Sequence, residues 1–151
     1  MRPSLDEYLM DAAILAATRT TCLRRGVGCV LASKRGHIMA VGYNGVAAGL
    51  PHCSQKDWKD EVPHACEGWR MAPGLDKCEA IHAEQNALLQ CRDPWEIETA
   101  YVTLSPCKAC LKLLLNTGCK RIVFLEEHID PLPSELWRKA GRIWEQIKPR
   151  S

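Results

Sequence analysis

Apolar side chains near the start of the chain recur at helical spacing, at Leu5, Leu9, Ala12, Ala13 and Ala16. Ser4 stands just before this stripe, and Glu7 follows it three residues later, which is the capping-box pattern of a helix start. We therefore predict a first helix that runs from Ser4 to about Thr20.

Two short β-rich runs follow, at Val27–Ala32 and His37–Asn44. Four residues ending in Gly36 separate them, which predicts an antiparallel hairpin. From Gly45 to about Cys78 no period is visible, and this stretch holds three cysteines and two histidines. Such a long irregular segment inside a compact domain usually has a function or an internal tether, and we predict a tether.

The second half of the chain alternates helical and strand patterns. The predicted elements are a helix over Ala80–Gln90 with Ile81, Leu88 and Leu89 buried, a strand over Thr99–Thr103, a helix over Cys107–Thr117 closed by Gly118 at its C′ position, a strand over Arg121–Leu125 and a helix over Ser134–Ala140. Strands separated by helices of this length indicate an α/β sheet covered on both faces.

Two interpretations of the C-terminal segment stay open. In one, Gly141 caps the last helix and Arg142–Ile147 forms an edge strand. In the other, the helix continues through Gly141, because Leu136, Ala140 and Ile143 also fit a helical stripe. Periodicity alone does not decide between them.

The composition is that of an ordinary globular protein. The 151 residues suffice for one domain over residues 1–151, with 46% hydrophobic and 25% charged residues. The 20 basic and 18 acidic residues leave a net charge of +2, which argues against binding a long polyanion such as nucleic acid. Neither an apolar run of about 18 residues nor a leader-like start is visible. We expect a soluble cytoplasmic protein without a membrane partner.

The chain has nine cysteines, and their odd number does not favour a disulfide framework. Inside a cell, such cysteines are more often metal ligands or reactive thiols. We expect some to be buried packing residues, namely Cys29, Cys91 and Cys119, which fall in predicted strands or at element ends.

Two segments that each begin a predicted helix carry metal-binding chemistry, His82-Ala83-Glu84 and Pro106-Cys107-Lys108-Ala109-Cys110. Cys107 and Cys110 are one helical turn apart, so both sulfurs can reach one ion, with His82 as a third ligand. Three protein ligands leave the fourth tetrahedral position of a zinc ion to water, as in catalytic sites. A redox Cys-x-x-Cys pair or a structural zinc site is the alternative.

Charge counting supports a catalytic ion. Two thiolates and a neutral imidazole would cancel the charge of Zn²⁺, whereas two helix N-termini aimed at the ion would restore the acidity of its water. Glu84 points about 200° around the helix from His82 and is poorly placed as a fourth ligand. We predict that Glu84 instead carries a proton from the water to the substrate.

These motifs resemble the cytidine deaminase superfamily, and more closely the deoxycytidylate (dCMP) deaminases. The matching segments are Thr21–Arg25, Val27–Val30, Gly42–Gly45, His52-Cys53, His82–Ala87 and Tyr101–Cys107. The resemblance implies a three-layer α/β/α sandwich with a mixed five-stranded sheet, which favours the edge-strand interpretation of Arg142–Ile147. It also implies hydrolysis of dCMP to dUMP and ammonia, feeding thymidylate synthesis. Alternatives are a bifunctional dCMP/dCTP deaminase and a tRNA- or single-stranded-DNA-editing deaminase.

The resemblance also assigns roles to residues. It makes His82, Cys107 and Cys110 the zinc ligands and Glu84 the proton shuttle. Asn44 matches the family's sugar-contacting residue, and an amide can both donate to and accept from a 3′-hydroxyl. The alternative is that Asn44 is a turn residue before Gly45. Arg25 or Arg24 is the candidate phosphate ligand, or an exposed surface arginine. Ser105 is a further candidate contact.

One departure from the family pattern concerns the base. Where the family typically places a tyrosine that stacks on cytosine, this chain has His128. An imidazole can also stack, and a solvated loop histidine is the alternative.

The resemblance extends to regulation. Family members are commonly hexamers activated by dCTP and inhibited by dTTP, with Mg²⁺ on the triphosphate. Their effector site lies near the segment that corresponds to Tyr43, Asn44 and Gly45, so effector control of a homo-oligomer is expected here.

A second, structural zinc would explain how the irregular segment holds its shape. Its expected ligands are Cys22, Cys53, Cys66 and Cys78, with His52 and His64 as possible substitutes. The alternative is that these cysteines are reduced, partly buried thiols.

Overall fold

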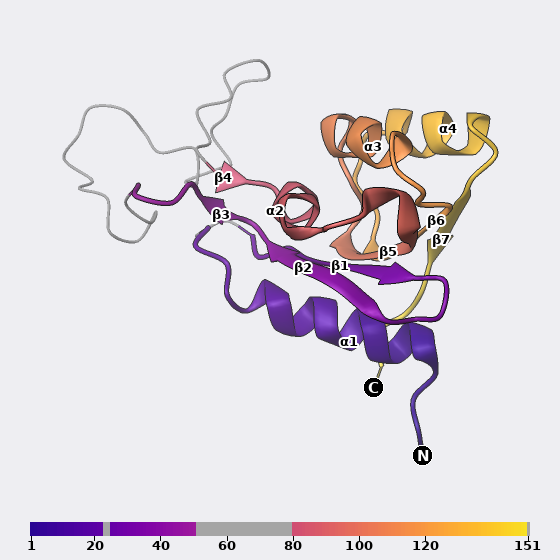
Figure 1. The fold of residues 1–151 in the computed structure, drawn as a ribbon, viewed down its shortest axis with the longest axis horizontal. Coiled ribbons are helices and arrows are strands. Elements are labelled where there is room, and N and C mark those ends of the chain that lie inside the picture. Colours follow the sequence, from indigo (N-terminus) through magenta and orange to yellow (C-terminus); the bar gives the residue numbers. More distant parts are fainter. Residues whose placement is uncertain (23–24, 51–79, 151) are drawn as a thin grey trace.

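A mixed five-stranded sheet forms the centre of the protein in the computed structural model, which describes residues 1–22, 25–50 and 80–150. Its strands are β1 (Gly28–Ser33), β2 (Ile38–Tyr43), β5 (Ile97–Leu104), β6 (Arg121–Glu126) and β7 (Ile143–Gln146). The spatial order is β2-β1-β5-β6-β7 (Figure 1). β1 runs antiparallel to β2 and β5, whereas β5, β6 and β7 are parallel, so the carboxyl ends of these three meet at one edge.

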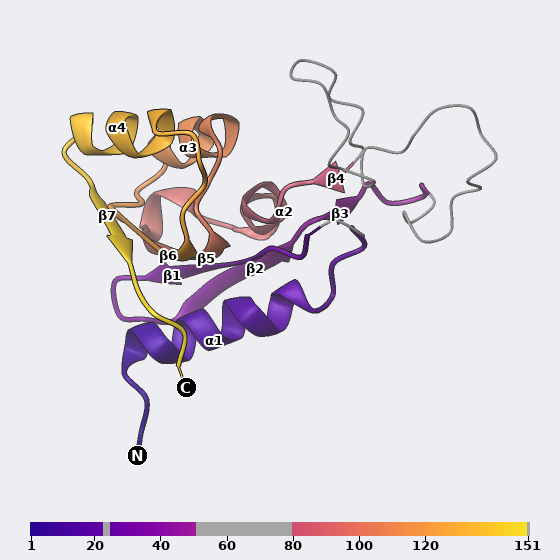
Figure 2. The same cartoon turned by 180° about the vertical axis from the view of Figure 1, so that it is seen from behind.

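Helices cover both faces of the sheet, as Figures 1 and 2 show. Helix α1 (Leu5–Ala17) packs on one face, over an apolar cluster that includes Leu9, Ala13 and Val30. The other face carries α2 (Ala83–Gln90), α3 (Lys108–Leu115) and α4 (Leu132–Lys139). The predicted three-layer sandwich with a mixed five-stranded sheet is therefore confirmed.

Helix α1 begins as predicted and ends earlier than predicted. The Glu7 N–H donates to Ser4 Oγ at 3.1 Å, and the Ser4 N–H donates to Glu7 Oε1 at 2.9 Å, so the capping box is complete. The helix ends at Ala17 rather than Thr20. There the backbone tightens, because the N–H groups of Arg19 and Thr20 donate to carbonyls three residues back.

The prediction of a helix from Ala80 is wrong at its start. Ala80–Ile81 is a short strand, β4, that pairs antiparallel with β3 (Gly45–Val46), and α2 begins only at Ala83. His82 is extended between them, which fixes the helix phase so that Ala83, Glu84 and Ala87 face inward. Leu89, predicted to be buried, is 77% exposed, whereas Ile81 and Leu88 are half-buried.

The two glycines predicted to end helices behave differently. Gly141 has a φ of +78°, and its N–H and that of Arg142 donate to Arg138 and Trp137 in a Schellman arrangement. That cap ends α4, and β7 follows, which confirms the edge-strand interpretation. Gly118 does not have the left-handed backbone of such a cap. It is needed instead for close packing, because a Cβ there would lie 2.0 Å from the carbonyl oxygen of Trp95. Trp95 belongs to a 3-10 helix that was not predicted, η3 (Pro94–Glu96).

The three cysteines expected to pack do so. Cys29 and Cys119 are fully buried, and Cys91 is half-buried against the same apolar cluster. In the described ranges, no helix has both the length and the apolar character needed to span a membrane.

Candidate active site

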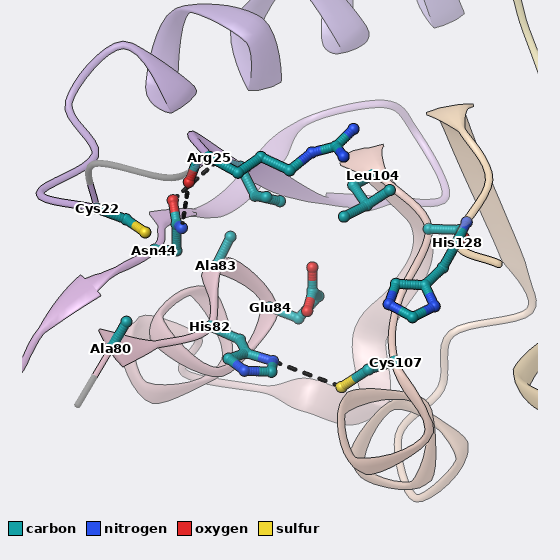
Figure 3. A pocket seen from close by; sticks show the side chains of 12 residues that line it. Cys22, Arg25, Asn44, Ala80, His82, Ala83, Glu84, Leu104, Cys107 and His128 are labelled. Atoms are coloured by element: carbon teal, nitrogen blue, oxygen red, sulfur yellow. Dashed lines mark hydrogen bonds between the residues drawn. The ribbon is translucent and has the colours of Figure 1, made fainter. Parts of the chain in front are cut away.

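Two helix starts bring one histidine and two cysteines together. His82 is the N-cap of α2, Cys107 is the N-cap of α3, and Cys110 lies in the first turn of α3. His82 Nδ1 lies 3.2 Å from Cys110 Sγ and 3.4 Å from Cys107 Sγ, and all three atoms lie within 4.8 Å of one another. Figure 3 shows the His82 ring and the Cys107 thiol facing each other across the two helix starts. Among the described residues, no other set of His, Cys, Asp or Glu side chains gathers in this way.

This geometry fits a zinc ion. Zinc binds imidazole nitrogen at about 2.0 Å and thiolate sulfur at about 2.3 Å in a tetrahedral site, which separates the two ligand atoms by roughly 3.5 Å. The observed distances of 3.2 and 3.4 Å are close to that separation. Three ligands leave one tetrahedral position for water or substrate.

The electrostatics of the helix starts suit a cation held by thiolates. A hydrogen bond from Cys110 lowers the pKa of the Cys107 thiol to about 4, with a further contribution from His82. The same hydrogen bond raises the pKa of Cys110. A metal ion would displace that proton, and the positive ends of α2 and α3 would help to keep both sulfurs ionised.

Glu84 is a buried carboxyl beside this group. It sits in the first turn of α2 with 3% of its surface exposed. Burial raises its pKa to about 6, an effect that a hydrogen bond with Cys110 and the charge of His82 partly offset. A carboxyl with this pKa can both accept and donate a proton near neutral pH.

A cavity of about 200 Å³ opens over Glu84, His82 and Cys107. Its walls are formed by residues from α2, β4, the carboxyl end of β5, the segment after β6 and the segments next to β1 and β2. These residues are Cys22, Arg25, Val27, Asn44, Ala80, Ala83, Leu104, Ser105 and His128. In Figure 3 the guanidinium of Arg25 lies across the cavity from His82 and Cys107, with Glu84 between them. One end can thus hold a metal ion, and the other presents a cation.

The match to a family model agrees with this geometry. The model described as "Cytidine and deoxycytidylate deaminase zinc-binding region" matches residues 3–126. The chain belongs to this deaminase family. It is therefore a zinc-dependent hydrolytic deaminase.

Several known proteins are similar to this deaminase. The deoxycytidylate deaminase of Mycobacterium phage D29 is 39% identical over 129 residues, which cover 83% of this chain and 98% of that protein. The deoxycytidylate deaminase of Saccharomyces cerevisiae is 35% identical over 93% of this chain, which spans only 44% of that longer protein. The crystal structure of the dCMP deaminase from cyanophage S-TIM5 in complex with dCMP and dUMP superposes with a TM-score of 0.73 at 26% identity, covering 97% of this chain and 99% of that one.

Asn44 of this deaminase lines the cavity and also braces the adjoining loop. Its Nδ2 donates to the carbonyl oxygen of Arg25 at 2.7 Å, and its Oδ1 accepts from the Val27 N–H at 2.8 Å and from Thr20 Oγ1 at 2.7 Å. Asn44 thus fits both interpretations, because it braces the turn through its hydrogen bonds and also lines the cavity where a sugar could bind. One N–H of Nδ2 is left for a ligand.

The other predicted substrate contacts also lie at the cavity. Arg25 forms an ion pair with Glu126. Ser105 is buried, and its Oγ accepts from the His128 N–H at 2.7 Å, which places His128 on the wall although much of it is exposed. Arg24 lies outside the described residues.

The proposed effector segment is next to a second cavity in the deaminase. Tyr43 and Gly45 line a space of about 530 Å³ with Arg19, Thr20 and Asn86, among others. Asn44 does not line it and faces the active-site cavity instead. Of the expected ligands of a second zinc, Cys22 lies on the active-site wall, whereas Cys53, Cys66 and Cys78, with His52 and His64, fall outside the described residues.

Sequence reasoning missed two residues at strand ends. Leu104 ends β5 and lines the active-site cavity, and its register partner Glu126 ends the parallel strand β6 and pairs with Arg25. Ligands of α/β proteins gather outside the carboxyl ends of parallel strands, and that rule would have pointed to both residues. Thr20 and Thr103, which bind Asn44 and the Gly28 N–H, carry no comparable sequence signal.

Proposed function

We propose that this deaminase hydrolyses dCMP to dUMP and ammonia and so supplies dUMP for thymidylate synthesis. The observation that carries the proposal is one cavity with His82, Cys107 and Cys110 grouped beside buried Glu84 at one end and Arg25 at the other. The similar cyanophage enzyme was crystallised with dCMP and dUMP, which supports a nucleotide of this kind.

His82, Cys107 and Cys110 are the proposed ligands of the catalytic zinc. When bound, zinc supplies the Lewis acidity that makes water a nucleophile at neutral pH. The starts of α2 and α3 hold the three ligands in place. His82, Cys107 and Glu84 line the same cavity, so a molecule in the cavity can reach both the ligand group and Glu84.

Glu84 is the proposed proton carrier. It takes a proton from the attacking water and places it on the ring nitrogen beside the amino-bearing carbon. It then carries the second proton of that water to the amino group, which leaves as ammonia when the C–N bond breaks and the carbonyl of uracil forms. A buried carboxyl with a raised pKa is suited to both transfers.

Arg25 and Asn44 are the proposed contacts of the nucleotide, and Ser105 positions His128 against it. Arg25 is the one Lys or Arg among the described residues that line the cavity, and a guanidinium can hold a phosphate with two hydrogen bonds. Asn44 offers its remaining N–H to the sugar. His128 lies on the wall where it can stack on the base.

Turnover of dCMP and deoxycytidine by the purified protein tests this function. We expect dUMP and ammonia in equal amounts from dCMP, and a kcat/KM for deoxycytidine lower by about 10²-fold, because a charged hydrogen bond is lost with the phosphate. Equal kcat/KM for the two substrates would contradict the proposed role of Arg25, and no product from either would contradict the function.

We also propose, from the family resemblance, activation by dCTP and inhibition by dTTP, each as its Mg²⁺ complex, in a hexamer. The second cavity supports a site for such effectors, since Tyr43 and Gly45 line it. Thr20 also lines this second cavity, and its hydroxyl is within hydrogen-bond distance of the carbonyl oxygen and Oδ1 of Asn44, which lines the active-site cavity. A hydrogen-bonded pair of residues therefore connects the walls of the two cavities.

The second zinc remains a prediction. Its expected ligands are Cys22, Cys53, Cys66 and Cys78, with His52 and His64 as substitutes. We expect metal analysis of the purified protein to find two zinc ions per chain, and a content of one would contradict the second site.

A further inference from the structure

Arg25, the cationic side chain on the active-site wall, is held by a carboxylate that the proposed reaction does not use. Glu126, at the carboxyl end of β6, forms an ion pair with Arg25. Another cavity, of about 540 Å³, has walls that include both members of this pair, with Thr103 and Leu125. Arg25 lines both spaces, and Glu126 lines only the second. The ion pair therefore marks the boundary between them.

We propose that Glu126 is a specificity-determining residue, which makes this deaminase select a nucleoside monophosphate and reject the corresponding di- and triphosphates. The inference rests on the proposed function, because it places the phosphate of the substrate at Arg25. It assigns Glu126 no part in the chemical step.

The position of Arg25 is fixed at two points. Asn44 Nδ2 binds its carbonyl oxygen at 2.7 Å, and Asn44 Oδ1 holds the Val27 N–H at 2.8 Å, so the backbone is tied to the end of β2. Glu126 fixes the other end of the side chain. Glu126 is itself placed by its register with Leu104, which lies on the active-site wall. The guanidinium is thus oriented before a nucleotide arrives.

The charges at this boundary suit one phosphate group. A guanidinium has five N–H donors, so Arg25 can keep Glu126 on one nitrogen and still offer N–H groups to an α-phosphate. A β- or γ-phosphate that extends past Arg25 would enter the space lined by Glu126. The described walls of that space hold no Lys or Arg besides Arg25. Each added phosphate therefore brings negative charge toward the carboxylate without a second cation, and such like-charge contacts oppose binding.

The test compares kcat/KM for dCMP, dCDP and dCTP in the wild type, Glu126→Gln and Glu127→Gln. Glutamine keeps the shape of glutamate and can still accept a hydrogen bond from Arg25, but it removes the negative charge. Glu127 is the matched control, because it is the next residue, loses the same charge, lines neither cavity and binds Trp144 Nε1 instead. Glu126→Asp retains the charge and serves as the conservative variant.

We expect Glu126→Gln to lower the preference for dCMP over dCTP by about tenfold or more, with dCDP between them. Glu127→Gln and Glu126→Asp should keep a preference close to that of the wild type. If Glu126 only braces Arg25, Glu126→Gln will change all three kcat/KM values by the same factor, and that result would overturn the inference. Absence of dCMP turnover in the wild type would instead refute the proposed function, so the two failures are distinguishable.

Discussion

Glu84→Gln is expected to lower kcat for dCMP by about 10²–10⁴-fold, the usual contribution of a positioned proton carrier. The amide keeps the size and polarity of the carboxyl but cannot take up and release a proton at neutral pH. Because Glu84 is buried and its charged form is disfavoured there, the neutral side chain should not weaken the fold. Zinc content should stay unchanged, since the proposed ligands are His82, Cys107 and Cys110. The measurements are steady-state turnover and metal analysis of the same sample.

Glu135→Gln is the matched control for this variant. Glu135 also lies in the first turn of a helix, α4, but it is exposed and lines no described cavity of the active site. The Glu135→Gln protein should turn over dCMP at the rate of the wild type. A Glu84→Gln protein that binds zinc and keeps wild-type turnover would show that another group carries the proton.

Gly42→Ala is expected to destabilise the protein by about 3 kcal/mol and to reduce activity as well, because it forces α2 away from the sheet. A Cβ at Gly42 would lie 2.3 Å from the carbonyl oxygen of Ala83 and 2.4 Å from the backbone nitrogen of Ala87. Both are backbone atoms of α2, so no side chain can turn aside to make room. The displaced helix start carries His82 and Glu84. For a chain of this length the loss corresponds to a fall in Tm of roughly 6–12 °C.

Val41→Ala provides the comparison on the same strand. Val41 is 36% exposed and its side chain leaves the opposite face of β2, so its truncation should cost about 1 kcal/mol or less. Thermal unfolding of both variants measures the difference, and dCMP turnover well below both Tm values shows the effect on the site. A Gly42→Ala protein as stable and active as the wild type would mean that α2 does not depend on this close approach.

The zinc-binding group was predictable because its information is local. The two cysteines are one helical turn apart in sequence, so their closeness follows from helix geometry alone. His82 and Glu84 belong to one short segment, and the error in the start of α2 did not separate them. The alternation of helices and strands likewise sufficed for the sheet and its covering layers.

The features that were missed depend on contacts between distant segments. β4 has two residues and exists because β3, far away in sequence, supplies its partner. Gly118 looked like a helix cap, yet its role depends on the backbone of Trp95. Glu126 had no sequence signal that linked it to Arg25, 101 residues earlier.

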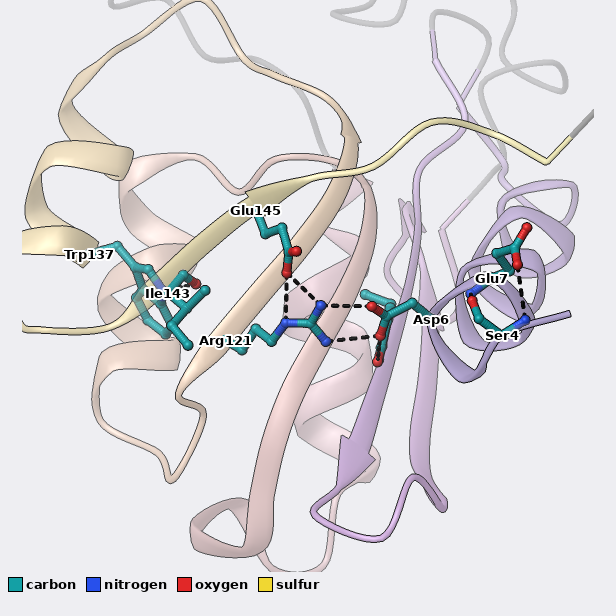
Figure 4. A network of polar contacts seen from close by, with 8 residues as sticks. Ser4, Asp6, Glu7, Arg121, Trp137, Ile143 and Glu145 are labelled. Carbon is teal, nitrogen blue, oxygen red and sulfur yellow. Dashed lines mark hydrogen bonds and ion pairs between the residues drawn. The ribbon is translucent and has the colours of Figure 1, made fainter.

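A polar network beneath α1 shows the same limit. Arg121 donates to both carboxylate oxygens of Asp6, at 2.9 and 2.7 Å, and its Nε donates to Glu145 at 2.8 Å (Figure 4). Tyr101 adds a hydrogen bond to Asp6 at 2.6 Å. The Arg121 guanidinium holds the pKa of Asp6 below its ordinary value. These residues join α1, β5, β6 and β7, and only the assembled sheet brings them together.

Removal and return of zinc tests the central claim most directly. The protein is stripped with a chelator, its fold is checked by circular dichroism, and dUMP formation from dCMP is followed as zinc is added back. If the His82, Cys107 and Cys110 group holds the catalytic ion, the folded, metal-free protein is inactive and zinc restores its turnover. Full turnover by a metal-free protein would contradict the account.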